Sequence, residues 1–392
     1  MRQDIAKRWI EDVDSLYSEL PQRHKNLYFR LNEVDFLENI QTLKRKVPRL
    51  NDAEIKVQIA RIIASVGDAH TSINMSLYYL CALEFYWFSD GIYAVNTSKA
   101  DEDLLYKRLT HIDGMEIKQV IDMLGTIISH ENQSFLKSLL PKYLPAIELL
   151  YGLKIAHKVE GLTFTVEDDK GNRQDCFVKS YPFKEAMEKL RANQIHITRN
   201  KLPFYRRNAD QNYWQEYIEA CKTIYFNYHT CREMADESVQ DFGNRLMHFI
   251  ETSSAEKLVI DLRNNTGGNS ALLDPFIETL AKCKKLNQTG KLFVILGRDT
   301  FSSALLNAYA LKNKTKAILV GEPSGGKPNC YGEVQRFTLK NSGFVVCYST
   351  KYYKLIADDL MPSLFPDVEK GLTMQNYLDN EDPCLDYILT YQ

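Results

Sequence analysis

Three short segments between Lys257 and Gly332 restrict the possible fold of this chain more than any other feature of its sequence. They read KLVIDLRNNTGGN, LFVILGRDTFSSALLNAYALK and AILVGEPSGGKPNCYGE. Each begins with an apolar, β-branched run that is too short for a helix, which predicts a buried strand. Each strand ends in a polar, glycine-containing turn, and the first two turns lead into helical patterns. Repeated strand, turn and helix is typical of an α/β sheet, which collects reactive groups at its strand ends.

Two of these turns carry the groups that acyl transfer needs. The middle turn places Ser302 and Ser303 at the start of a helix, where free N–H groups and the helix dipole favour a developing anion. The first turn ends in Gly267 and Gly268, which lack side chains and let backbone N–H groups approach another group closely. A hydroxyl beside two backbone donors combines a nucleophile with an oxyanion hole. These motifs predict a serine hydrolase, and among hydrolases they favour a peptidase.

Length and composition limit the class of protein. A chain of 392 residues predicts two or three domains, and 44% hydrophobic with 26% charged residues is ordinary for a folded soluble protein. The formal charge of −2 gives no general attraction to nucleic acid or acidic membranes. The longest aromatic and aliphatic stretch, LYYLCALEFYWF from Leu77, is too short to span a bilayer.

The cysteines and the start of the chain bear on compartment and cofactors. Eight scattered cysteines show no CxxC or metal-ligand spacing, which predicts mostly buried free thiols in a reducing compartment. No metal or other cofactor is implied. The first residues, MRQDIAKRWIEDVDSLY, are amphipathic and acidic rather than a cleavable signal, so we expect a cytoplasmic protein, or an exported one if the N-terminus was trimmed.

Hydrophobic periodicity divides the rest of the chain. The first seventy residues are predicted to be helical, and Asn51 and Glu54 form a capping-box pattern before an apolar stripe. Gly67 stops that helix, and His70 follows it. Short strands and one amphipathic helix are expected from about Leu77 to Tyr181, and a polar connector over 186–212. After Gly332 come two alternating strands joined by a turn at 341–343.

Four segments are similar to one known family. They are VGDAHT (66–71), LVIDLRNNTGG (258–268), GRDTFSSA (297–304) and VGEPSGGKPNCYGE (320–333). They resemble, in the same order, segments of the tail-specific, or C-terminal processing, serine peptidases, a family that includes the core of tricorn protease. YYKLIADDLMPSLFPDV near the end is a weaker match to that family's PD-containing segment. The turn at Ser302 lacks the G-x-S-x-G elbow of the α/β-hydrolases, which disfavours that family.

The resemblance implies a division of the chain into three parts. An N-terminal helical region would cover 1–75, a small PDZ-like α/β unit 76–185, and a crotonase/ClpP-like α/β catalytic domain 186–392. LTHIDGMEIKQVIDML resembles the loop, strand and helix of a PDZ-like unit but has no clear carboxylate-binding signature. Recognition of substrate tails by that unit is therefore left open.

The resemblance also implies a catalytic site. Its nucleophile maps to Ser302, and its oxyanion donors map to the backbone N–H of Ser303 and of either Gly267 or Gly268. In the tricorn-like branch the general base is the histidine of the G-D-x-H-T motif, which maps to His70.

Two candidates for the general base remain open. Branches of the family that use a Ser–Lys dyad place the lysine where Lys327 stands here. Chemistry favours His70, because imidazole is a competent base near neutral pH, whereas Lys327 would need burial to lower its pKa by several units. Asp359, with Asp358 beside it, is the candidate to orient His70.

Each candidate also has a purely structural explanation. Ser302 and Ser303 could be helix N-caps, and the paired glycines could serve only a tight turn. Lys327 could be a surface turn residue. We expect the polar residues of the IDLRNN segment to form structural hydrogen bonds that hold the loop. These residues are Asp261, Arg263 and Asn265.

Three functions are compatible with these motifs. The leading one is an ATP-independent serine endopeptidase that acts on peptides, protein tails or unfolded segments. The first alternative is a catalytically silent protein of the same fold that binds a peptide or another ligand. The second is acyl-CoA chemistry on a crotonase-like core, although no cluster for the CoA phosphates stands out in the sequence.

Overall fold

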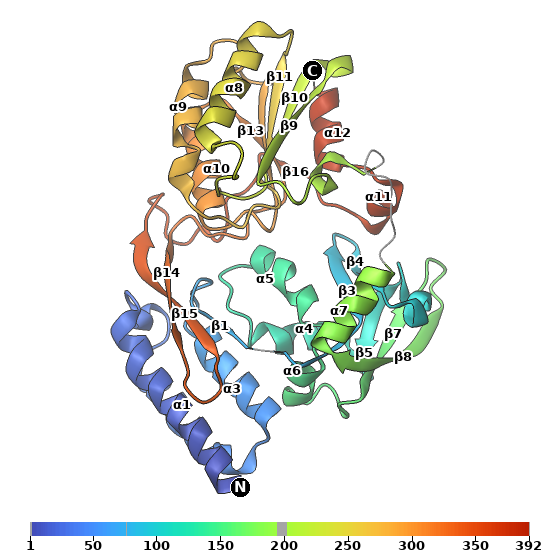
Figure 1. Cartoon of the computed structure of the whole chain (residues 1–392), viewed down its shortest axis with the longest axis vertical. Helices are drawn as coiled ribbons and strands as arrows, with labels where there is room; N and C mark the ends of the chain where they lie inside the picture. The colour runs from blue at the N-terminus through green and yellow to red at the C-terminus, as the bar shows by residue number, and fades with distance from the viewer. Residues whose placement is uncertain (1, 76, 194–201, 392) are drawn as a thin grey trace. The chain divides into compact units, whose positions relative to one another are not determined.

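The computed structural model describes residues 2–75, 77–193 and 202–391 of a mixed α/β protein (Figure 1). The described residues form two compact units. The first unit comprises those within Met1–Glu131, Leu139–Ile195 and Cys330–Tyr353. The second comprises those within Asn132–Ser138, His196–Asn329 and Lys354–Gln392.

A six-stranded sheet forms the centre of the described part of the second unit. Its order is β16 (Val368–Glu369), β13 (Ile318–Gly321), β12 (Leu292–Leu296), β11 (Lys257–Asp261), β10 (Thr223–Tyr228) and β9 (Tyr213–Ile218). All neighbours are parallel except β9, which is antiparallel to β10. The three predicted strands are confirmed as β11, β12 and β13. Because β11 and β12 are parallel neighbours, the turns that follow them start at the same edge of the sheet.

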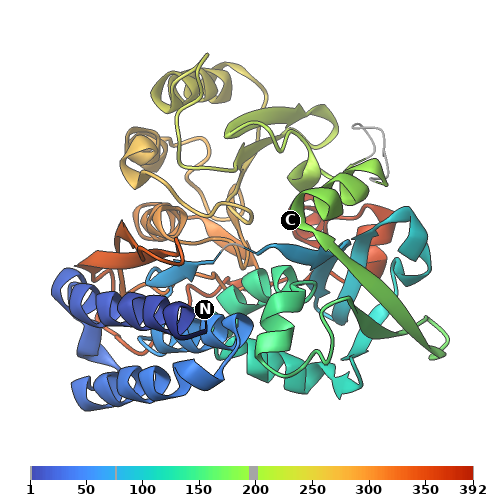
Figure 2. The same ribbon diagram turned by 60° about the horizontal axis from the view of Figure 1, so that its bottom comes forward.

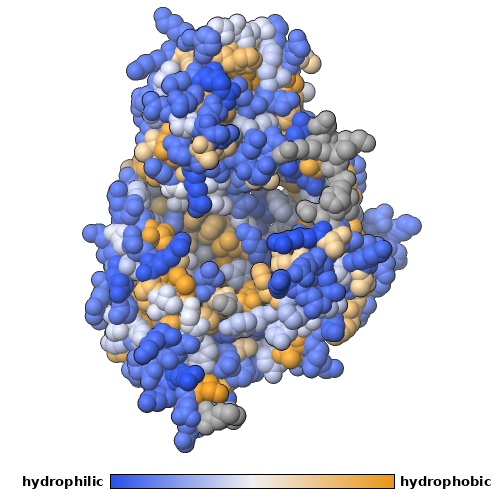
Figure 3. Space-filling model, in the orientation of Figure 1, coloured by the Kyte–Doolittle hydropathy of each residue, from blue (hydrophilic) through white to orange (hydrophobic). Residues whose placement is uncertain are grey.

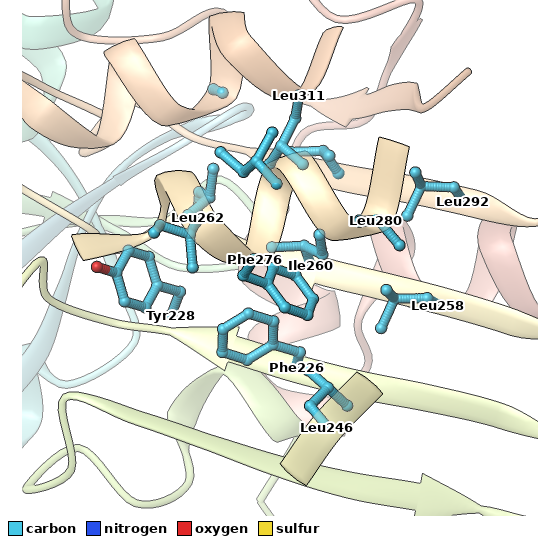
Figure 4. Packing of buried hydrophobic residues seen from close by; sticks show 14 of the residues in the cluster. Phe226, Tyr228, Leu246, Leu258, Ile260, Leu262, Phe276, Leu280, Leu292 and Leu311 are labelled. Carbon is cyan, nitrogen blue, oxygen red and sulfur yellow. The ribbon is translucent and has the colours of Figure 1, made fainter. Parts of the chain in front are cut away.

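Helices cover both faces of this sheet. Alternate strand residues such as Phe226, Ile260 and Val294 pack against α8 (Val239–Thr252), α9 (Asp274–Lys282) and α10 (Ser303–Lys314), and Figure 4 shows this core. The intervening residues, such as Tyr225, Val259 and Phe293, pack against α12 (Pro383–Thr390). Burial on both faces explains why these strands are continuous apolar runs in the sequence.

The first unit begins with three helices. They are α1 (Arg2–Arg23), α2 (Glu33–Lys46) and α3 (Asp52–Ala64), and Figure 2 shows them packed beside one another. Both hydrogen bonds of the predicted Asn51–Glu54 capping box are present. Buried residues of these helices, including Leu16, Phe36 and Ile59, share a core with Phe344 and Val346.

The predicted C-terminal hairpin is confirmed. Strands β14 (Cys330–Thr338) and β15 (Val345–Tyr353) are antiparallel, and β1 (Ser72–Asn74) pairs with the other edge of β15. The hairpin belongs to the first unit, although the chain enters it from the second. The division of the chain at residues 75 and 185 stays a prediction.

A second sheet of the first unit matches the strands expected after Leu77. It contains β2 (Tyr79–Cys81), β3 (Leu83–Phe88), β4 (Gly91–Thr97), β5 (Arg108–Ile112), β6 (Met115–Glu116), β7 (Gly161–Glu167) and β8 (Arg173–Pro182). The predicted amphipathic helix after Gly114 is α4 (Ile117–Gly125), and α6 (Ile147–Gly152) packs on α3.

The connector predicted over 186–212 is wrong in its first part. Helix α7 (Phe183–Ala192) extends into it, because Ala186 and Leu190 recur at helical spacing and are buried. Residues 194–201 of that connector lie outside the described residues. Its last part holds only a short 3-10 turn, Phe204–Arg206.

The remaining features of the fold are the surface of the protein and the state of its cysteines. The face displayed in Figure 3 is largely hydrophilic with scattered apolar residues. Among the described helices, none combines the length and apolar character needed to cross a membrane. All eight cysteines are free, and four of them are buried.

Candidate active site

The turn between β12 and α10 is built against the end of β11. The Thr300 hydroxyl donates to the carbonyl oxygen of Leu262 at 2.8 Å and accepts the N–H of Gly297 at 3.0 Å. Gly297 lies so close to Arg263 that a Cβ there would stand 2.7 Å from the Arg263 carbonyl oxygen. These contacts join the turn that carries Ser302 to the loop that carries Gly267 and Gly268.

Ser302 has a strained backbone at the point where α10 begins. Its φ of 52° and ψ of −125° are unusual for a residue with a side chain. Ser302 occupies the N-cap position of α10, but its hydroxyl forms no capping hydrogen bond with the helix. Strain of this kind persists where the surroundings enforce it, and it clusters at functional sites.

The two glycines of the loop after β11 are both required by close contacts. A Cβ on Gly267 would lie 2.8 Å from the Cβ of Ser302, and one on Gly268 would lie 2.2 Å from the carbonyl oxygen of Cys231. Both have positive φ, 108° and 138°. The loop therefore lies directly against Ser302 on one side and against Cys231 on the other.

Among the described residues, a hydrogen-bond partner is present for the N–H of Gly267 but not for that of Gly268. The N–H of Gly267 donates to the side-chain oxygen of Asn265 at 2.9 Å. The N–H of Gly268 forms no hydrogen bond with any described residue, and neither does that of Ser303 in the first turn of α10. Which of the two glycines acts as an oxyanion donor stays a prediction.

Asn265 organises the loop from a fully buried position. Its side-chain N–H donates to the carbonyl oxygen of Tyr228 at 2.7 Å, and its own carbonyl oxygen accepts the N–H of Phe301 at 3.1 Å. Arg263 donates to both Asp261 and Asp382. The expectation that the polar residues of IDLRNN hold the loop by hydrogen bonds is confirmed.

A segment distant in sequence packs on the same turn. The Phe135 ring stacks on the ring of Phe301, which precedes Ser302, with centroids 4.2 Å apart. The Ser138 hydroxyl donates to the carboxylate of Asp299, and the Asn132 side chain donates to the carbonyl oxygen of Gly325 at 2.9 Å. These residues were not predicted, because no motif in the sequence around them indicates a role.

His70 lies in the first unit, between the end of α3 and β1. Helix α3 ends at Ala64, three residues before Gly67, whose φ is 75°. Burial lowers the pKa of His70 below its usual 6.5, although the charge of Asp68 and the backbone of Tyr331 act in the opposite direction. The imidazole is consequently neutral at pH 7 and can accept a proton there.

Asp68 is the acidic residue that the structure places next to His70. Its carboxylate accepts the backbone N–H of His70 at 2.9 Å and lies 4.0 Å from the imidazole Nδ1. Although burial raises the pKa of Asp68, hydrogen bonds from His24, Ser349 and Thr71 outweigh it and lower the pKa. Asp68 was not among the predicted site residues, although it stands in the same motif, two positions before the histidine.

The other predicted residues have local partners in the second unit. Asp359 accepts from the Asn329 side chain at 2.5 Å and lies 3.5 Å from Lys354 Nζ. Lys327 is half-buried and follows Gly326, whose N–H donates to the carbonyl oxygen of Thr300 at 3.0 Å. Because His70 and Asp68 belong to the first unit and Ser302, Lys327 and Asp359 to the second, the choice of base and acid stays a prediction.

The site contains one thiol, Cys231. Burial raises its pKa to about 11, although its hydrogen bonds with Asn265 and Tyr228 lower it in part. The thiol is therefore protonated at neutral pH and is a weak nucleophile. In the part of the chain that the structure describes, no group of three or more His, Cys, Asp or Glu residues is arranged to hold a metal ion.

Comparison with known proteins gives a similarity of fold. No family model and no curated protein matches the chain. Mature CPAF complexed with lactacystin matches with a TM-score of 0.64 and 14% identity, over 98% of this chain and 99% of that chain. A serine-to-alanine variant of CPAF matches with a TM-score of 0.66 and 13% identity, over 99% of both chains. The photosystem II D1 C-terminal processing protease also matches, with a TM-score of 0.44 and 13% identity, over 98% of this chain and 96% of that chain. The chain is therefore similar in fold to CPAF.

Proposed function

We propose that this chain is a serine peptidase that hydrolyses peptide bonds in peptides or unfolded protein segments, with Ser302 as its nucleophile. One observation carries the proposal. Ser302 is held in a strained conformation at a strand-to-helix turn, and its hydroxyl does not cap the helix. The neighbouring N–H groups of Ser303 and Gly268 have no hydrogen-bond partner among the described residues. A hydroxyl flanked by two such donors has the composition of an acyl-transfer site.

The reaction would proceed through an acyl-enzyme. Ser302 Oγ bonds to the carbonyl carbon of the scissile peptide while its proton passes to His70, and the carbonyl oxygen becomes an oxyanion held by the two N–H groups. The C–N bond then breaks, and the leaving amine takes the proton from His70. Water, deprotonated by the same imidazole, attacks the ester, and the acid product leaves with the Ser302 hydroxyl restored.

His70 is the proposed general base and Lys327 the alternative. The lowered pKa of the buried imidazole supports His70, because a neutral base is then present at pH 7. Asp359 is one proposed acid that orients His70. Asp68 is a second candidate, because the Asp68 carboxylate lies 4.0 Å from the imidazole Nδ1.

The family assignment is part of the same proposal. The four sequence motifs, taken in order, support a tail-specific serine peptidase of the tricorn-core-like branch. Its parts would be a helical region over 1–75, a PDZ-like unit over 76–185 and a crotonase-like catalytic domain over 186–392. The parallel sheet with helices on both faces agrees with such a catalytic domain.

Covalent labelling tests the proposal directly. A serine-reactive fluorophosphonate should modify Ser302 in the intact protein, as located by mass spectrometry of its peptides. Ser302→Ala should abolish labelling and lower peptide hydrolysis by a factor on the order of 10⁶. The matched control is Ser254→Ala, which removes an exposed hydroxyl bonded to Tyr217 and should change neither measurement.

Two results would contradict the proposal. Labelling of Ser303 with an active Ser302→Ala variant would place the nucleophile one residue later. A wild-type protein that binds peptides but is neither labelled nor hydrolytic would instead be a silent binding protein.

A further inference from the structure

The N–H of Gly268, a proposed oxyanion donor, belongs to a peptide group whose orientation is fixed by a hydrogen bond to Cys231. In the peptide between Gly267 and Gly268, the carbonyl oxygen accepts the N–H of Cys231 at 3.1 Å. Because a trans peptide directs its C=O and N–H to opposite sides, the N–H of Gly268 points away from Cys231. Gly268 itself must lack a Cβ, since one would meet the carbonyl oxygen of Cys231.

The next peptide group is held at both of its ends. The N–H of Asn269 donates to the carbonyl oxygen of Cys231 at 2.8 Å. The carbonyl oxygen of Gly268 accepts the side-chain hydroxyl of Ser303 at 2.7 Å. The peptide groups on both sides of the Gly268 Cα are thus fixed by hydrogen bonds. These bonds restrict the backbone of a residue that has more conformational freedom than any other.

Ser303 contributes to both proposed donors. It supplies one N–H from its own backbone and fixes the Gly268 carbonyl through its side chain. Its side chain is buried, with 8% of the residue exposed, so water does not readily replace it. The hydrogen bond from the Ser303 hydroxyl is therefore one of the contacts, together with those of Cys231, that set the distance between the two N–H groups.

From this geometry we infer that the Ser303 hydroxyl is a positioning residue for catalysis, which holds the N–H of Gly268 in register with that of Ser303. The inference rests on the proposed peptidase function. A preorganised donor stabilises charge only where the charge develops, so its misplacement affects the transition state more than the bound substrate. Loss of the hydroxyl should therefore lower kcat and leave KM nearly unchanged.

Three variants of the full chain test this. Ser303→Ala should lower kcat by roughly 10²–10³-fold, the range seen when an oxyanion donor is lost, with KM unchanged within a factor of about three. Its affinity for a peptide aldehyde, which forms a tetrahedral adduct with the nucleophile, should fall by a similar factor. Ser303→Thr keeps a hydroxyl and should restore most of kcat. Ser303→Cys, with a weaker donor, should give an intermediate value.

Ser238→Ala is the matched control. It removes a serine hydroxyl at the start of α8 in the same unit, away from the site, and should leave kcat unchanged. Thermal unfolding of each variant shows whether the fold persists. Three results would overturn the inference alone. The first is a Ser303→Ala variant with wild-type kcat, and the second is a Ser303→Ala variant in which only KM changes. The third is a Ser303→Thr variant that folds but has a kcat as low as that of Ser303→Ala. A wild-type protein that hydrolyses no peptide overturns the proposed function and the inference with it.

Discussion

Close contacts surround Ser302 in its strained conformation. Gly267 packs against its Cβ, and the N–H of Phe301 is bonded to Asn265. The apolar runs and glycine turns of the sequence predicted that Ser302 would start a helix after a strand. They could not show which glycine N–H remains free, because that depends on the side chain of Asn265 and on Cys231, a residue outside the motif.

The identity of the base can be tested by the pH dependence of kcat/KM. If His70 accepts the proton, kcat/KM should stay level around pH 7 and fall only below pH 6.5, because burial lowers the pKa of His70 and the protonated imidazole cannot act as a base. His70→Ala should then lower kcat/KM by on the order of 10³-fold or more. Both are measured with one peptide substrate.

Lys327→Ala is the companion variant. It should have a mild effect if His70 is the base. An active His70→Ala variant, together with an inactive Lys327→Ala and a rate that rises toward alkaline pH, would identify Lys327 instead.

The two loop glycines should not tolerate alanine. Gly268→Ala drives a Cβ into the carbonyl oxygen of Cys231, and Gly267→Ala drives one into Ser302, so both should abolish hydrolysis and lower the unfolding temperature. Gly171→Ala is the control, since its φ of 81° is also positive but nothing lies within 4 Å of the added Cβ. It should stay active with a small loss of stability. Wild-type activity in Gly268→Ala would remove that residue from the site.

Elements with a strong local pattern were predictable, and those set by distant contacts were not. The strands β11, β12 and β13 stood out because burial on both faces demands continuous apolar runs. Helix α7 was missed, since only Ala186 and Leu190 mark its buried face in a polar segment. Helix α5 (Gln133–Leu139) carries Phe135, whose ring stacks on Phe301 beside Ser302. These two phenylalanines are more than a hundred residues apart in the sequence, so no local pattern indicates the contact.

Phe135→Ala tests whether that helix supports the site. Removal of a buried ring that stacks on Phe301 should lower the free energy of unfolding by about 3 kcal/mol or more. It should also slow fluorophosphonate labelling of Ser302, because the turn loses its packing partner. Phe183→Ala is the control, since that ring is 47% exposed at the start of α7. Equal labelling rates in Phe135→Ala and wild type would show that the helix only adds stability.

The end of the chain closes onto the central sheet through a buried charge network. Arg263, just after β11, donates to both carboxylate oxygens of Asp382 at 2.9 and 2.8 Å, and Asp382 in turn caps α12. The Tyr225 hydroxyl donates to Asp261, the second carboxylate around Arg263. The composition of the chain could not reveal this link, because Asp382 is one of many acidic residues in a polar tail.

Asp382→Ala should therefore destabilise the fold strongly. The change leaves the buried guanidinium with one carboxylate in place of two and removes the cap of α12, and the loss of one partner of a buried ion pair costs about 3–5 kcal/mol. Chemical denaturation with the slope of the transition compared between variants gives the value. Glu256→Ala is the control, because its ion pair with Lys222 is exposed on both sides and should contribute little. If the two variants unfolded at the same denaturant concentration, the C-terminal helix would be held by its apolar face against Val259 and Phe293, and the Arg263 network would serve only to orient the loop that carries Gly268.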